Sequence, residues 1–405
     1  MTSLIAWLDA SSEEQRRMRD IIHLFADRDS RDELGLGQIR DALSDALFPG
    51  TSTLHTRARY LLLVPWVFQE AAKRLNPTAE VDRMERRLIS AIHDSEDYAG
   101  LLGMQAGAAL KTLPSSIYWS MLRRYRILSD SSLRMQDALI LDGQRLGGDD
   151  LSDATRHRFH AWSSTMPRAP IGFPTVVAGG FALRHEEAAW LCERILDAVP
   201  GTLMAHFAIN PPSPDSQAPW AEPSTQYLSG EAKAYLGHAR SFSAVMHGAQ
   251  LLYNLMLAEQ HQDAGFDSDR DFVATYRDEL DVWAERLPGD VDVEMWNIED
   301  LLVRVHSERG APVHPRSVRF VRDWRDLLRD TPPAHLLSHP RARKLISDRE
   351  RHNKGPQARL GNRRRLQSWG GSSGSGAMTF RWSSVRTILT DIHNGLDREP
   401  EPDDA

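Results

Sequence analysis

Hydrophobic residues recur at helical spacing along most of this chain. After the capping box formed by Ser11 and Glu14, for example, Met18, Ile21 and Phe25 follow at intervals of three or four residues. The same spacing predicts helices in these further segments: Gly37–Phe48, 51–75 with caps at Thr51–Thr53, Glu80–Ile92, Ser115–Leu128, Asp153–Trp162, His185–Ala198, Ser229–Gln260, Asp267–Arg286 and Val291–His306. The chain is therefore predicted to be mainly helical.

Strand patterns are few, and loops are marked by composition. The two best strand candidates are Phe173–Val177 and Met378–Trp382. Stretches rich in Gly, Pro, Asp or Ser predict surface loops at Asp142–Asp150, Asn210–Ser224 and Gly370–Gly376. We therefore expect a multi-helix globular protein of the mainly α class, with few short strands and a flexible Gly/Ser loop near the C-terminus.

Changes in composition divide the chain into four predicted parts. These are an N-terminal helical domain at 1–141, a central helical domain at 151–309, a C-terminal basic region at 310–396 and an acidic tail at 397–405. Five acids and two prolines occupy the nine residues of the tail. Such a composition is typical of disorder, because it offers little apolar surface to bury.

Composition also bounds the class of protein. A chain of 405 residues that is 41% hydrophobic can fill several cores. The single cysteine, Cys192, excludes a disulfide framework and a thiolate zinc site, and it fits a reducing compartment. The N-terminus does not resemble a secretory signal, and no apolar run approaches the roughly 20 residues that cross a bilayer. We therefore expect a cytoplasmic protein without membrane contact.

The strongest chemical signal is a basic segment near the C-terminus. Between Arg341 and Arg365 the chain places ten Lys or Arg residues against two acids, although the whole protein carries a formal net charge of −7. A cationic stretch on an acidic protein is typical of a surface that meets a polyanion. The ten cations are Arg341, Arg343, Lys344, Arg349, Arg351, Lys354, Arg359, Arg363, Arg364 and Arg365.

The surroundings of the basic segment extend this hypothesis. The cations up to Lys354 would lie on a helix that Gly355 and Pro356 end. Trp369 would offer a surface on which a base can stack, and Gly370–Gly376 would offer free backbone N–H groups to phosphates. Two plainer interpretations stay open: the cations form a solvated face, or they pair with acids of the same protein or its oligomer.

A predicted helical hairpin is a second candidate contact. Two helices would meet across a Pro-Gly turn, and the second would begin with His55, Arg57 and Arg59, as in a helix-turn-helix that reads bases. The Leu-Leu-Leu-Val-Pro-Trp run that follows is so apolar that this helix must be largely buried, which favours a core hairpin. Arg57 and Arg59 would then pair with Asp41 or Asp45.

A nuclease pattern can also be assembled from the sequence. Asp215, Glu231 and Lys233 match the letters of the PD-(D/E)xK motif, in which two carboxylates bind Mg²⁺ and the lysine stabilises charge on phosphate. That chemistry normally lies on adjacent strands, whereas Asp215 falls in a proline-rich loop and Glu231 begins a helix. No histidine pair has a third metal ligand nearby. The sequence therefore favours a non-enzymatic protein with no metal and no cofactor.

Several stretches together resemble a known family. They are Ser3–Asp9, Arg31–Gly37, Leu47–Tyr60 and Gly248–Met256, followed by the basic segment. In these stretches the chain resembles an uncharacterised bacterial family that is defined only as a domain of unknown function, number sixty-three sixty-one. The resemblance implies no activity. It does imply a genomic setting, because genes of this kind often lie beside restriction and phage-defence genes.

Three functional hypotheses follow. The first is a non-enzymatic, nucleic-acid-contacting component of a bacterial multi-protein system, such as one that defends against phage. The second is a scaffold that docks on an acidic partner protein, and the third is a divergent Mg²⁺-dependent nuclease using Asp215, Glu231 and Lys233. Salt-dependent binding to nucleic acid distinguishes the first from the second, and metal-dependent cleavage identifies the third. The charge asymmetry of the basic segment favours the first.

Overall fold

The structure is a computed structural model. It describes residues 32–104, 106–147, 160–266, 268 and 270–400. Three of the predictions lie wholly or mostly outside these ranges: the first helix, the helix at Asp153–Trp162 and the acidic tail. The chain forms two compact units, each made of two separate stretches: unit 1 is Met1–Leu43 with Gly237–Met378, and unit 2 is Ser44–Leu236 with Thr379–Ala405.

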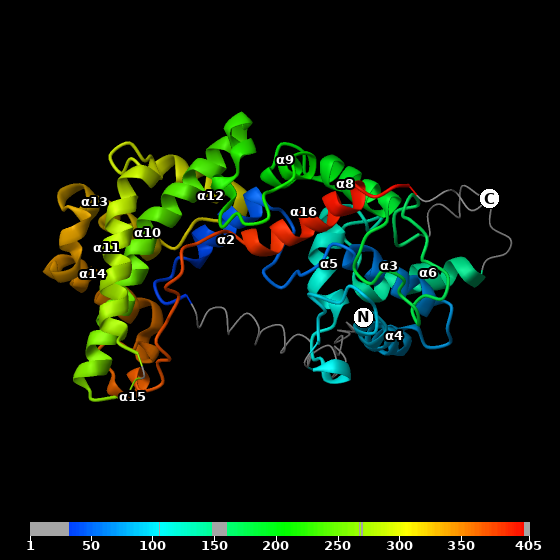
Figure 1. Cartoon of the computed structure of the whole chain (residues 1–405), viewed down its shortest axis with the longest axis horizontal. Coiled ribbons are helices and arrows are strands. Elements are labelled where there is room, and N and C mark those ends of the chain that lie inside the picture. Colours follow the sequence, from blue (N-terminus) through cyan, green and yellow to red (C-terminus); the bar gives the residue numbers. More distant parts are fainter. Residues whose placement is uncertain (1–31, 105, 148–159, 267, 269, 401–405) are drawn as a thin grey trace, which may run out of the picture. The chain divides into compact units, whose positions relative to one another are not determined.

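Unit 2 is helical and has the most apolar of the described helices in its core. Its helices are α3 (Tyr60–Ala72), α4 (Pro77–His93), α5 (Pro114–Arg124), α6 (Met135–Gly147), α8 (His185–Ala198), α9 (Leu203–Ile209) and α16 (Trp382–Leu396), with short 3-10 helices η1 (Gly107–Ala109), η3 (Pro219–Ala221) and η4 (Pro223–Tyr227). α3 packs against α4, α5 and α6, while α16 packs against α8 and α9 (Figure 1).

The burial of α3 follows directly from its sequence. All residues from Tyr60 to Phe68 are buried, because apolar side chains cover every side of this helix and other helices surround it. The prediction that the Leu-Leu-Leu-Val-Pro-Trp run lies in the core is confirmed. Even so, α3 has only 13 residues, and none of the described helices is both long and apolar enough to cross a membrane.

Unit 1 is also helical and contains the basic segment. Its helices are most of α2 (Gly37–Leu47) and of α10 (Gly230–Asp263), then α11 (Phe272–Asp290), α12 (Ile298–Arg309), α13 (Pro315–Asp330), η5 (Pro333–Ser338), α14 (Pro340–Lys354), η6 (Gly355–Gln357) and α15 (Arg363–Leu366). α13 and α14 lie side by side (Figure 1).

The long helix α10 is the centre of unit 1. Residues 251–258 of α10 are all buried. Gly248 lets α11 approach closely, because a Cβ at this position would lie 2.2 Å from the Trp283 ring. The indole N–H of Trp283 donates to the Ala244 carbonyl at 2.8 Å, and that of Trp324 on α13 donates to the Val245 carbonyl at 2.9 Å. α10 therefore anchors both neighbouring helices.

Most predicted helices are confirmed within a few residues, and two local predictions are wrong. The second helix of the hairpin begins at Tyr60, so Thr51–Thr53 do not cap it. The predicted loop at Asp142–Asp150 is helical up to Gly147, the end of α6. Asp142 is buried there. Its carboxylate accepts hydrogen bonds from the indole N–H of Trp162 at 2.8 Å and from a backbone N–H, which compensate for the loss of water.

Neither strand prediction is correct. Phe173–Val177 forms turns, and Met378–Trp382 leads through a turn into α16. In the second segment Phe380 and Arg381 have φ values of 53° and 67°, a left-handed conformation that an extended strand excludes. Apart from one isolated two-residue bridge, the described ranges hold no β-structure. The protein is mainly helical.

Candidate polyanion-binding site

Helix α14 organises the basic segment. The His339 ring accepts a hydrogen bond from the Ala342 N–H at 3.4 Å, and Pro340 occupies the first turn, where no backbone N–H is needed. The helix ends where Gly355 takes a φ of 52°. The prediction of a basic helix ended by Gly355 and Pro356 is therefore confirmed.

Three of the ten cations share one exposed face of α14. The side chains of Arg341, Lys344 and Arg351 are 60%, 75% and 67% exposed, and their spacing along the helix places them on one side. Asp348 lies between them, 2.6 Å from Lys344 and 3.4 Å from Arg351, and the hydrogen bond from Lys344 lowers the pKa of Asp348. We call this group the α14 stripe. Its exposed ion pairs contribute little and can exchange for phosphates.

Three other cations are already paired with carboxylates of unit 1. Arg343 forms an ion pair with Glu259. Arg359 and Lys354 both bind Glu33, at 2.6 Å and 3.4 Å, and Glu33 is buried. The plainer interpretation, in which basic residues pair with acids of the same protein, is therefore correct for these three positions.

Arg349 is buried and holds a distant loop against α14. Its Nε donates to the Leu34 carbonyl at 2.6 Å, and its Nη2 donates to the Gly35 carbonyl at 3.1 Å and to the Ser317 hydroxyl at 2.7 Å. Burial lowers the pKa of Arg349, while the charge of Asp32 raises it. The predicted role of Arg349 as an exposed phosphate contact is therefore wrong, because only 7% of the residue is exposed.

The buried acid of the segment, Glu350, fixes the chain after α14. One carboxylate oxygen accepts hydrogen bonds from the Tyr253 hydroxyl and from the Arg359 N–H, both at 2.7 Å, and the other accepts from the Leu360 N–H at 3.0 Å. Burial raises the pKa of Tyr253. Glu350 therefore shapes the turn toward α15, and the other acid among residues 341–365, Asp348, is partly exposed.

The last three cations, Arg363, Arg364 and Arg365, form a second exposed group on α15. Asn362 caps this short helix by accepting from the Arg365 N–H at 3.3 Å. The Arg363 guanidinium lies 5.0 Å from the centre of the Phe266 ring. The basic segment thus presents two exposed cationic groups, the α14 stripe and the α15 arginines, rather than one continuous surface.

Trp369 lies in a core and cannot serve as a stacking surface. Its ring packs against Phe272 and His261, with ring centres 5.3 Å and 5.6 Å apart, and the residue is buried. A base would have to displace these neighbours. The prediction that Trp369 stacks on a base is therefore wrong.

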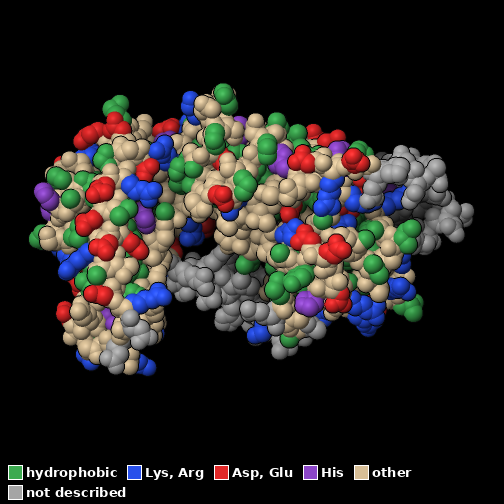
Figure 2. Space-filling model, viewed as in Figure 1, with side chains coloured by type: hydrophobic (Ala, Val, Ile, Leu, Met, Phe, Trp, Pro, Cys, Tyr) green, Lys and Arg blue, Asp and Glu red, His purple; other side chains and the backbone are tan. Residues whose placement is uncertain are grey.

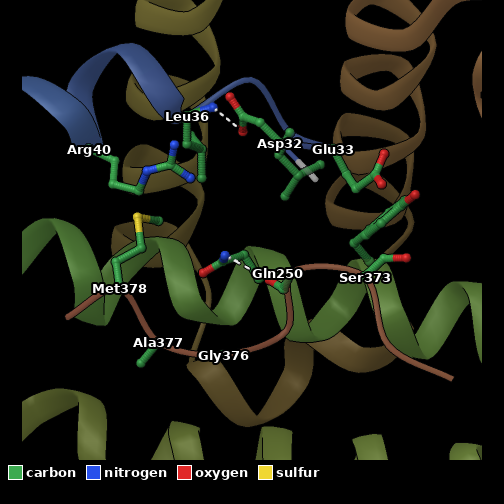
Figure 3. Close-up of a pocket in the computed structure, with 12 residues that line it drawn as sticks. Asp32, Glu33, Leu36, Arg40, Gln250, Ser373, Gly376, Ala377 and Met378 are labelled. Carbon is green, nitrogen blue, oxygen red and sulfur yellow. Dashed lines mark hydrogen bonds between the residues drawn. The ribbon is translucent and has the colours of Figure 1, made fainter. Parts of the chain in front are cut away.

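The Gly/Ser loop, Gly370–Gly376, is tied to α10 (Figure 3). Asn254 donates to the Ser373 carbonyl at 3.0 Å and accepts from the Ser373 N–H at 2.8 Å. Gln250 and His247 donate to two further loop carbonyls at 2.8 Å and 3.0 Å. The expectation of free backbone N–H groups in this loop is therefore wrong at Ser373, and these hydrogen bonds hold the loop along one face of α10.

A small cavity of about 250 Å³ lies beside this loop (Figure 3). Asp32 lines it, but its carboxylate caps α2 by accepting from the Leu36 N–H at 2.7 Å. Arg40 lines it too, but its Nε donates to Asp41 at 3.0 Å. The ionic groups of this cavity are therefore engaged within the protein, and they specify no ligand.

A larger, polar cleft of about 400 Å³ borders α14 on the side of Arg349. Besides Arg349 and Lys354, its wall includes Arg316 and Ser317 from the first turn of α13. We call it the Arg349 cleft. Arg316 was not predicted as a site residue, because it lies outside the basic segment and nothing in the sequence indicates that α13 and α14 pack together.

Residues 2–395 match a family of unknown function, DUF6361. The chain belongs to this family. No curated protein and no solved structure matches it.

In this DUF6361 chain the predicted start of the hairpin's second helix is buried. The His55 ring stacks on Tyr118 with ring centres 4.5 Å apart, and Arg59 forms an ion pair with Glu187 at 3.0 Å. His55 and Arg59 are each 1% exposed. Neither can meet a base, so the prediction of a secondary nucleic-acid contact at His55 and Arg59 is wrong and the core hairpin is correct.

Arg57 is also structural, although its partners differ from those predicted. Its guanidinium binds Asp97 at 2.7 Å and Asp391 at 2.9 Å. Asp41 and Asp45 pair with other arginines instead. Burial lowers the pKa of Arg57, but the hydrogen bonds that Arg57 donates to Asp97 and Asp391 outweigh this effect and raise the pKa overall. A contact between Arg57 and nucleic acid would require breaking both pairs.

The residues of the nuclease pattern lie on a loop and a helix. Asp215 is exposed in the loop after α9, while Glu231 and Lys233 are exposed in the first turn of α10. None of the three lies on a strand, so the strand geometry typical of this motif is absent at these residues. Within the described ranges, no three His, Cys, Asp or Glu side chains are grouped so that they could hold a metal ion.

Proposed function

We propose that this protein is a non-enzymatic component that contacts nucleic acid through the α14 stripe and the α15 arginines. The observation that supports the proposal is the α14 stripe itself, in which three long, exposed cations point from one side of a rigid helix. Cations held in this way can neutralise consecutive phosphates and release the counterions that surround a nucleic acid, which favours binding.

The same geometry predicts weak binding with little sequence preference. Phosphate contacts position a protein but carry no sequence information, and the exposed cations of the stripe and of α15 are expected to meet phosphates. Lys/Arg and Asp/Glu side chains are interspersed over the face of the molecule that Figure 2 shows. Asp348 and Asp330, which lie beside cations of the stripe, repel a polyanion, so we expect an affinity in the non-specific range, roughly 10⁻⁴–10⁻⁶ M at physiological salt.

Matched charge variants test the proposal. The stripe variant carries Arg341→Ser, Lys344→Ser and Arg351→Ser. The control carries Arg319→Ser, Arg322→Ser and Arg329→Ser on α13, and it has the same change in net charge. Two of the control arginines are neutralised by Glu299 and Glu294, at 2.7 Å and 2.5 Å. Fluorescence anisotropy with a labelled duplex should show weaker binding for the stripe variant than for the control.

The outcomes separate the competing hypotheses. Equal loss in both variants would mean that overall charge, and not the stripe, attracts nucleic acid. Absence of binding by the wild-type protein at about 50 mM salt, where contacts with phosphates are strong, would contradict the proposal and favour the acidic-partner scaffold. Degradation of the duplex only when Mg²⁺ is added would favour the nuclease. The role in a multi-protein defence system rests on the family resemblance alone and stays a prediction.

A further inference from the structure

The Arg349 cleft is lined by cations and by neutral hydrogen-bond donors. Its volume of about 400 Å³ lies within the roughly 300–1,000 Å³ range of small-molecule sites. Its wall comes from three parts of unit 1: the segment 32–38, the first turn of α13 and the C-terminal half of α14. These parts are far apart in the sequence and are joined by the hydrogen bonds of Arg349.

Arg349 supplies a buried guanidinium whose hydrogen bonds are incomplete. Nε and Nη2 donate to two backbone carbonyls and one hydroxyl, and none of these acceptors is a carboxylate. A guanidinium has five N–H donors, and Nη1 makes no hydrogen bond within the described part of the chain. Because Arg349 lines the cleft, its Nη1 donors are the ones left to meet a ligand.

The cleft carries excess positive charge. Arg316, Arg349 and Lys354 contribute three positive charges and Asp32 one negative charge, which leaves +2 with the histidines neutral. Burial lowers the pKa of Arg349, Asp32 raises it, and the charge of Arg316 lowers it, so the two guanidinium groups repel each other. Lys354 is partly neutralised by Glu33, 3.4 Å away, whereas Arg316 forms no ion pair with any described residue.

Both oxygens of the one lining carboxylate already accept hydrogen bonds from the backbone. Asp32 accepts the Leu36 N–H and the Gly37 N–H, each at 2.7 Å, so both of its oxygens cap α2. Gln38 accepts the His314 N–H at 2.8 Å, which leaves its amide NH₂ group as a further donor at the rim. The cleft also borders the N-terminus of the 16-residue helix α13, where the helix dipole favours negative charge.

We propose that the Arg349 cleft binds a phosphate group, carried either by a nucleic-acid strand or by a small molecule. The charge of a phosphate dianion balances the +2 of the cleft. Its tetrahedral oxygens can accept hydrogen bonds from donors on three separate elements at once, and arginine is well suited to donate such bonds to phosphate. The inference goes beyond the proposed function, because the α14 stripe can bind a strand without the cleft and the cleft can bind free phosphate without the stripe.

Isothermal titration of the full chain with inorganic phosphate tests the proposal. Ionic strength is held constant with chloride, so that screening does not change during the titration. The wild-type protein should bind phosphate saturably at one site. Arg316→Gln should weaken this binding at least tenfold, whereas Arg319→Gln, one turn further along α13 and outside the cleft, should leave it within a factor of two. Absence of phosphate binding, or equal binding by the two variants, would overturn the proposal.

A second variant removes the buried cation. Arg349→Met should abolish phosphate binding in protein whose circular dichroism still matches the wild type. If Arg349→Met does not fold, the comparison of Arg316→Gln with Arg319→Gln still decides. Retained phosphate binding in folded Arg349→Met would also overturn the proposal.

The source of the phosphate is found by competition. Three competitors are each titrated into protein that has inorganic phosphate bound: a nucleoside monophosphate, a short oligonucleotide with a 5′-phosphate and the same oligonucleotide without it. Displacement by the 5′-phosphorylated strand alone identifies a strand end, and displacement by the mononucleotide identifies a small molecule. If the protein binds nucleic acid but not phosphate, the proposal for the cleft is refuted and the proposed function is retained. If it binds phosphate but not nucleic acid, only the proposed function is refuted.

Discussion

Arg57→Ala should destabilise unit 2 strongly. In the folded protein the Arg57 guanidinium donates to both oxygens of Asp97, at 2.7 and 2.8 Å, and its Nε donates to Asp391 at 2.9 Å. Only 11% of the Arg57 side chain and 8% of that of Asp391 are exposed. The substitution therefore leaves a buried carboxylate that retains a single donor, the Ala58 N–H at 2.8 Å.

The size of the effect follows from these contacts. Removing one partner of a buried ion pair costs about 3–5 kcal/mol, because the remaining charge is left without compensation. The pair with Asp97, which is more exposed, adds at most about 1 kcal/mol. We therefore expect the free energy of unfolding to fall by about 3 kcal/mol or more.

Urea unfolding followed by tryptophan fluorescence measures this change. The control is Arg83→Ala, which removes an exposed ion pair with Glu80 on α4 and should cost less than about 1 kcal/mol. Adding Asp391→Asn to Arg57→Ala should restore part of the stability, because the buried carboxylate is then neutral. An Arg57→Ala protein as stable as the Arg83→Ala control would refute the assignment of Arg57 to the core.

Two further predictions concern unit 1. Gly35→Ala should lower the free energy of unfolding more than Gly361→Ala in the same urea assay. Both glycines have positive φ, a conformation that costs a residue with a Cβ about 1–2 kcal/mol. Only at Gly35 would the Cβ also clash with Arg349, 2.1 Å from its Nη2. Equal losses would contradict the packing of Arg349 on this loop. Burial lowers the pKa of His247 below its usual 6.5. As the pH falls through 6.5, His247 is therefore protonated in the unfolded chain before it is protonated in the folded protein. The folded protein loses stability over this range, by at most about 1.4 kcal/mol per pH unit. His247→Gln should lack this loss between pH 7.5 and 5, and an unchanged pH dependence in this variant would contradict the assignment.

The sequence predicted the helices because helical periodicity is local. The end of α14 followed from Gly355 and Pro356, and the burial of α3 followed from its apolar run. Features that depend on contacts between residues far apart in the sequence were not predicted. The Gly370–Gly376 loop was expected to be flexible from its composition, yet Asn254, some 119 residues away in sequence, holds it on α10.

The basic segment was found from the sequence, but which of its cations are exposed was not predicted. A count of cations does not distinguish Lys344, which is exposed, from Arg349, which is buried. The distinction was partly present in the sequence, because Arg349 follows Ala342 and Ile346 at helical spacing and so shares their buried face. The partner of Arg349 could not be found, since Leu34 is 315 residues away in sequence.

The salt dependence of nucleic-acid binding tests the central claim most directly. If the α14 stripe and the α15 arginines contact about six phosphates, a plot of log K against log salt for a duplex should have a slope of about −5, and the stripe variant should lose about 3 from its magnitude. This result would establish that these cations meet the phosphate backbone. A wild-type protein that fails to bind at about 50 mM salt, or a stripe variant with an unchanged slope, would contradict the account.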